Sequence, residues 1–88
     1  MPLVFVPSAM RHITGGVDKL RVEGTTIRQV LEQLESRFPG FKERIVDEEG
    51  SLQPGVAIAI GNELTVLGVL TPVQESDEVH FIPAIGGG

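Results

Sequence analysis

The most distinctive chemistry in the sequence lies in its last residues, Gly86, Gly87 and Gly88. Glycine makes up about 7% of an average protein, so a run of three at one end is rarely a chance event. Because glycine destabilises regular structure, we expect residues 84–88 to form a flexible tail beyond a folded domain of residues 1–83. A segment without Cβ atoms can pass through a narrow channel in a partner protein and present the α-carboxylate of Gly88 to a phosphorus atom.

The carboxylate of Gly88 is itself a poor acyl donor, but an acyl-adenylate formed on it is a mixed anhydride. A persulfide, a sulfide or an amine attacks such an anhydride readily. The tail therefore has the features of a substrate for another enzyme and not those of a catalyst. The alternative interpretation is that the glycines are an incidental disordered end.

The other candidate groups do not form a catalytic or metal-binding set. His12 and His80 stand far apart in the sequence, with no cysteine or nearby carboxylate pair to complete a nucleophile or a metal site. We expect both to be surface or interface side chains. The acidic stretch 47–51 lacks the spacing of a calcium loop and indicates a solvated loop. Gly15 and Gly16 lack the spacing of a phosphate-binding motif and predict a turn.

The composition limits the remaining function classes. With 88 residues, of which 41% are hydrophobic and 22% charged, the chain forms one small domain and leaves no room for a separate catalytic lobe. Its net charge of -5 disfavours nucleic acid and anionic membranes as partners. No signal peptide or membrane span is evident, and we expect a soluble cytoplasmic protein.

Hydrophobic periodicity predicts one main helix. Its apolar positions, spaced as on one helix face, are Ile27, Val30, Leu31, Leu34 and Phe38. The stretch 26–29 fits a capping box at the start of this helix, and Pro39 with Gly40 ends it. A further short helical turn is expected over 41–45.

Several segments carry the apolar or alternating patterns of strands. They are residues 3–6, 17–23, 56–60 and 79–82, with a short edge strand in 64–70. The uninterrupted apolar run 56–60 predicts the central strand. The order of strand, strand, helix, strand, short strand and strand predicts an α+β fold of the ubiquitin-like β-grasp kind. This fold has a mixed sheet of four to five strands, with one main helix packed on one face.

The chain resembles the ubiquitin-like sulfur carriers over essentially its whole length. The similar parts are the turn 61–63 after an apolar strand, the stretch 71–73 leading to 77–79, and the ending 81–88. The family includes the small subunit of molybdopterin synthase, the thiamin sulfur carrier and the cysteine-biosynthesis carrier of actinobacteria. The segment 6–16, in which Arg11 precedes Thr-Gly-Gly, is similar to the last of these.

The resemblance implies a set of partners. A ubiquitin-activating-type adenylyltransferase would use ATP to adenylate Gly88, and a sulfur donor such as a sulfurtransferase would convert it to a thiocarboxylate. A downstream synthase would then accept the sulfur. Gly86 and Gly87 would give clearance in the partner's channel. The chain would be a carrier without a bound cofactor and not an enzyme, although it could form the small subunit of a synthase complex.

The resemblance also implies a docking region near the tail, formed by Phe81, Ile82 and Ile85. Because strand side chains alternate, we expect at least one of Phe81 and Ile82 to be a core residue, which makes Ile85 the better interface candidate.

Two other functions stay open. The activated Gly88 could be joined to lysines of target proteins, or the chain could be a non-catalytic β-grasp interaction module. The sequence also leaves open the pathway that receives the sulfur, whether of the cysteine, molybdopterin or thiamin type. The roles of Arg11 and of the turn from Thr14 to Gly16 are likewise open.

Overall fold

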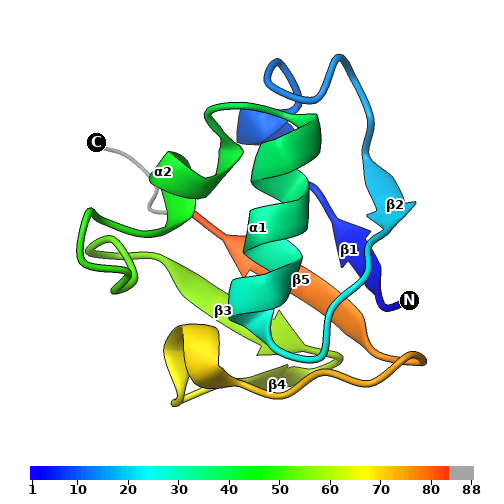
Figure 1. Cartoon of the computed structure of the whole chain (residues 1–88), viewed down its shortest axis with the longest axis vertical. Helices are drawn as coiled ribbons and strands as arrows, with labels where there is room; N and C mark the ends of the chain where they lie inside the picture. The colour runs from blue at the N-terminus through cyan, green and yellow to red at the C-terminus, as the bar shows by residue number, and fades with distance from the viewer. Residues whose placement is uncertain (84–88) are drawn as a thin grey trace.

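The computed structural model describes residues 1–83, which form a mixed sheet covered on one face by a long helix (Figure 1). Among these residues the sheet has five strands in the order β2-β1-β5-β3-β4. The strands are β1 (Leu3–Phe5), β2 (Lys19–Arg21), β3 (Ala57–Ile60), β4 (Glu63–Leu64) and β5 (Glu78–Ile82). β1 and β5 are parallel, and the other neighbours are antiparallel. The predicted β-grasp fold is confirmed.

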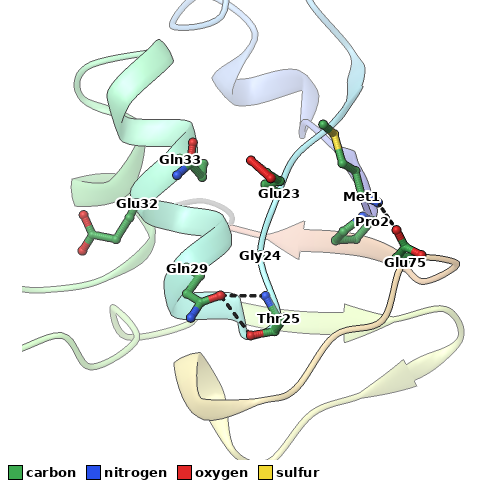
Figure 2. A pocket seen from close by; sticks show the side chains of 9 residues that line it. All are labelled: Met1, Pro2, Glu23, Gly24, Thr25, Gln29, Glu32, Gln33 and Glu75. Atoms are coloured by element: carbon green, nitrogen blue, oxygen red, sulfur yellow. Dashed lines mark hydrogen bonds and ion pairs between the residues drawn. The ribbon is translucent and has the colours of Figure 1, made fainter.

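The main helix, α1 (Ile27–Arg37), begins at the predicted residue. The Thr26 hydroxyl accepts a hydrogen bond from the Gln29 amide at 3.3 Å, as a capping box requires. The Gln29 side chain, however, accepts from the Thr25 amide at 2.8 Å and not from that of Thr26 (Figure 2). The second half of the capping box is therefore displaced by one residue toward the N-terminus. Thr26 also forms an isolated antiparallel bridge with Pro72.

One hydrophobic core lies between the helices and the sheet. The apolar stripe of α1 is buried, and the short helix α2 (Phe41–Ile45) adds two further fully buried residues. These helical core residues are Ile27, Val30, Leu31, Leu34, Phe41 and Ile45. The sheet contributes Val4, Ile58, Val79 and Phe81 from its covered face. Burial of this kind contributes about 1.5–3 kcal/mol for each large aliphatic side chain.

Two features differ from the prediction. The central strand is β5, whereas β3, formed by the apolar run expected at the centre, lies between β5 and the short edge strand β4. The predicted turn at Gly15 and Gly16 is present, but the connection after β1 also contains a 3-10 helix, η1 (Ser8–Met10), which buries Met10 at 2% exposure. A second 3-10 helix, η2 (Gly68–Leu70), follows the edge strand as part of the segment expected to be a loop.

None of the helices in residues 1–83 is long and apolar enough to cross a membrane. The predicted tail of residues 84–88 lies outside the described residues.

Candidate functional site at the end of β5

β5 carries the chain from the core to Pro83, the residue before the glycine-rich segment. Its side chains alternate between the two faces of the sheet. Val79 and Phe81 are buried under the helices, whereas His80 is half-buried on the open face and Ile82 is 41% exposed there. The end of β5 therefore presents one side chain to the core and the next to the surface.

Phe81 is a core residue, at 4% exposure. Its ring meets that of Phe41 edge to face, with centroids 5.8 Å apart and planes inclined by 73°. Phe81 is therefore the core residue that was expected in this pair, because its side chain is packed against α2 and is covered. Ile82 is exposed and keeps its docking role as a prediction.

α2 is held against α1 by Glu35. The backbone amides of Lys42 and Gly40 donate to the Glu35 carboxylate, at 2.9 Å and at 3.1–3.2 Å. These hydrogen bonds favour the ionised carboxylate and so hold the pKa of Glu35 below its ordinary value. The hydrogen bond from the Lys42 amide has the largest effect and that from Gly40 the second largest. Glu35 thus fixes the start of the helix that covers Phe81.

The open face of the sheet has an exposed apolar surface beside the end of β5. Strand register places Ala57 opposite Ile82, and Ala59 opposite both His80 and Leu64. The small alanines leave the larger neighbours uncovered, and Leu64 is 66% exposed. The Thr65 amide donates to the Ile58 carbonyl at 2.9 Å, which extends the β3–β4 ladder beyond β4.

Val66, two residues after Leu64 in the bend that follows β4, is 95% exposed. Leu64, Val66 and Ile82 together are called the open-face patch below. Exposed apolar side chains gathered on one face mark interaction surfaces more often than scattered ones do.

His80 lies next to this patch and is stacked on Phe5. The ring centroids are 4.4 Å apart and the planes are inclined by 12°. The imidazole also lies 3.9 Å from the Glu78 carboxylate. His12 is exposed in the segment that follows η1, and His80 is half-buried on the open face, so the two histidines do not form one site.

A groove lies in another part of the described residues. Figure 2 shows it between the N-terminus and the start of α1, with Glu23, Glu32 and Glu75 among its lining residues and a volume of about 530 Å³. Since Met1 precedes β1 and Glu75 precedes β5, this groove is at the end of the sheet opposite to Pro83. Within residues 1–83, no group of three or more histidine, aspartate or glutamate side chains could hold a metal ion.

The structure thus brings only part of the predicted site into view. Ile85, Gly86, Gly87 and Gly88 lie outside the described residues. Leu64 and Val66 were missed by sequence reasoning, which took residues 64–70 only as an edge strand and a loop. The signal that could have found them is the apolar run 64–70, which has more apolar residues than an edge strand can bury.

Comparison with known proteins gives consistent relatives. Residues 4–88 match the model of the ThiS family. The chain is 32% identical to the sulfur carrier protein CysO of Mycobacterium tuberculosis, covering 97% of this chain and 96% of that protein.

Solved structures agree with this match. A chain of the Amycolatopsis orientalis BexX/CysO complex superposes with a TM-score of 0.91 and 29% identity over the full length of both chains. M. tuberculosis CysO gives a TM-score of 0.88 and 29% identity, covering 97% of this chain and all of that one. The small archaeal modifier protein 1 of Methanosarcina acetivorans gives 0.80 and 26%, covering 98% of this chain and 94% of that one.

Proposed function

The chain belongs to the ThiS family of sulfur carriers, and on that premise we propose that it carries sulfur as a thiocarboxylate on Gly88. The observation that carries this proposal is the extent of the family match, which runs through Gly88 and so includes all three terminal glycines. The fold supports it, because β5 delivers the chain to Pro83 from a fixed position in the core.

The chemistry has two steps, both carried out by partner enzymes. In the first, a carboxylate oxygen of Gly88 attacks the α-phosphorus of ATP, the bond to pyrophosphate breaks, and an acyl-adenylate forms. In the second, a sulfur nucleophile attacks the Gly88 carbonyl carbon and AMP leaves with the electron pair of the C–O bond. With hydrosulfide as nucleophile, one proton is released and the product is the thiocarboxylate.

This chain's contribution to the chemistry is recognition and delivery. Gly86 and Gly87 leave the last residues narrow enough for the activating enzyme's channel. We assign docking to the open-face patch, whose Ile82 lies next to Pro83 at the start of the segment that would enter the channel. A CysO relative crystallised together with BexX supports binding to a partner protein.

The first step is tested with the activating enzyme of the source organism, ATP and hydroxylamine. Hydroxylamine attacks an acyl-adenylate at the carbonyl carbon and leaves a hydroxamate. We expect the full-length chain to support ATP–pyrophosphate exchange and to gain a hydroxamate that tandem mass spectrometry places on Gly88. A variant lacking Gly88 is the control. Equal exchange by both forms would refute the proposed site of activation.

A second function is supported by one of the comparisons. The M. acetivorans relative is named a modifier protein, and an acyl-adenylate on Gly88 would react with a lysine amine as well as with sulfur. In that case, cells expressing the tagged chain would contain conjugates with an isopeptide bond from Gly88 to lysine. Their absence, together with thiocarboxylate on the free chain, would leave sulfur transfer as the function.

A further inference from the structure

A cluster of basic side chains lies at the end of the sheet where β5 reaches Pro83. Its two cationic members are Arg11 and Arg44, and His12 lies beside them; all three are exposed, and together they are called the basic cluster below. The Arg44 Nη2 atom lies 3.4 Å from the His12 Nε2 atom. Since a guanidinium group can only donate, His12 Nε2 is the acceptor in this contact. The contact joins α2 to the segment that follows β1.

Arg11 is hydrogen-bonded to the residue that follows β1, the strand beside β5. Its Nε atom donates to the Val6 carbonyl oxygen at 3.3 Å. Val6 directly follows β1, which runs parallel to β5 with Phe5 opposite His80. The C-terminal ends of both strands therefore lie at the same end of the sheet, and Arg11 lies at that end.

Arg44 lies in α2, the helix that packs against β5. Phe41, three residues earlier in the same helix, packs on Phe81. Figure 1 shows α2 beside the end of β5. Both arginines thus flank the residues from which the proposed sulfur-carrying segment departs.

The turn after Arg11 is built to hold that residue. The Arg11 carbonyl accepts hydrogen bonds from the amides of Thr14 at 3.2 Å and Gly16 at 2.8 Å. The buried Thr14 hydroxyl lies 2.9 Å from the Val17 carbonyl and 3.2 Å from that of Arg11. Gly15 and Gly16 have φ values of 67° and 93°, and a Cβ atom there would meet no other atom, so they are needed for backbone conformation and not for space. The Thr-Gly-Gly turn therefore has a physical role, which is to fix Arg11.

Neither arginine has an internal ionic partner within residues 1–83. The ion pairs in this part of the chain are Met1–Glu75, Lys42–Glu32 and His80–Glu78. Acidic residues outnumber Lys and Arg by twelve to seven, and yet none of those within residues 1–83 forms an ion pair with Arg11 or Arg44.

We propose that the basic cluster binds aspartate and glutamate side chains of the adenylating enzyme at the mouth of the channel that takes the tail. This inference rests on the function proposed above. Guanidinium groups match carboxylates in a two-point geometry. On a protein of net charge -5, an acidic partner surface is repelled except at a local cationic spot, which therefore orients the approach of the two proteins.

The test compares the full-length chain with Arg11→Gln/Arg44→Gln. Glutamine at position 11 can still donate to the Val6 carbonyl. The matched control is Arg21→Gln/Arg28→Gln, which removes the same charge away from the cluster: Arg21 lies across β1 from Glu78, the first residue of β5, and Arg28 lies in the first turn of α1. Binding to the source organism's activating enzyme is measured by calorimetry without ATP, and pyrophosphate exchange is measured separately. Arg44→Gln alone serves if the double variant does not fold.

We expect the double variant to raise Kd, and KM for exchange, by roughly 5–20-fold at about 50 mM salt, with kcat unchanged. The effect should shrink to about 2-fold or less at about 500 mM salt, where the cluster is screened. Arg11→Lys/Arg44→Lys should recover most of the loss, because it keeps the charge. The control double variant should change Kd by less than about 2-fold.

Each other outcome is decisive. Equal Kd values for wild type and the double variant would overturn the role of the cluster, and so would an equal loss of affinity in the control double variant. If wild type still supports pyrophosphate exchange, the proposed function is unaffected by either result. Salt-sensitive binding that depends on the cluster but gives no exchange supports the cluster and contradicts activation at Gly88. No binding by wild type overturns both.

Discussion

Phe41 in α2 and Phe81 in β5 meet edge to face, with ring centroids 5.8 Å apart. Phe81 is the last buried residue of β5, two positions before Pro83. This contact fixes the end of the central strand, so the point from which the glycine-rich segment departs is set by the core. The function proposed above would use such a fixed departure point, because binding is weakened when a segment has to be ordered first.

Phe81→Ala should therefore act on stability. Truncating a buried phenylalanine leaves a cavity and costs about 3–5 kcal/mol, a large part of the about 5–15 kcal/mol that stabilises a small domain. Denaturant unfolding measures the loss. Ile82→Ala, one residue further on the open face, is the control and should cost less than about 1 kcal/mol. Similar losses for both variants would contradict the alternation described here.

Ile82→Gln should act on recognition instead. Ile82 is 41% exposed, so we expect the free energy of unfolding to stay within about 0.5 kcal/mol of wild type. KM for the carrier in pyrophosphate exchange should rise by roughly 10-fold, because a central apolar contact at an interface is lost. Leu70→Gln is the matched control, since Leu70 is 62% exposed in η2, which packs against α1 on the covered side of the sheet. An equal rise in KM for both variants would argue against the open-face patch.

Glu35→Gln should change how stability depends on pH. Its pKa is lowered in the folded chain, so the stability from the ionised carboxylate is present above the unfolded pKa and is lost as pH falls through the folded pKa. The variant should be less stable than wild type at pH 7, and the difference should shrink between about pH 5 and about pH 3. Urea unfolding across this range measures it. Glu49→Gln, in the exposed loop after α2, is the control, and a difference between Glu35→Gln and wild type that does not vary with pH would contradict the assignment.

Two threonines offer a test with opposite signs. The Thr14 hydroxyl is hydrogen-bonded to backbone carbonyls, whereas the Thr65 hydroxyl oxygen is buried without a hydrogen-bond partner among the described residues. Thr14→Val should cost about 1 kcal/mol, and Thr65→Val should leave stability unchanged or raise it by up to about 1–2 kcal/mol, because it removes an unsatisfied polar group. Thermal unfolding of both variants decides. A loss for Thr65→Val as large as that for Thr14→Val would contradict the difference in hydrogen bonding.

Much of the fold could be predicted because its signals are local. The stripe from Ile27 to Leu34 repeats with the helical period, and Thr26 caps the helix that follows. The position of β5 at the centre could not be predicted in this way. It depends on pairing with β1 from the opposite end of the chain, and no local pattern distinguishes β5 from β3.

The site was predictable only in part, for a similar reason. Alternation indicated that Phe81 and Ile82 point to opposite faces, but which of them is buried depends on the packing of α2, which is a contact between distant segments. The basic cluster likewise joins Arg11 to Arg44 through tertiary structure. Gly86, Gly87 and Gly88, by contrast, lie outside the described residues, and their chemistry is inferred from the sequence.

The most direct test of the proposed function is the intact mass of the full-length chain after incubation with its activating enzyme, ATP and sulfide. We predict a mass increase equal to the replacement of one oxygen atom by sulfur, which tandem mass spectrometry places at Gly88 and which a chain lacking Gly88 does not show. An unchanged mass with an enzyme that demonstrably adenylates the chain would contradict sulfur transfer and leave the modifier function as the better account.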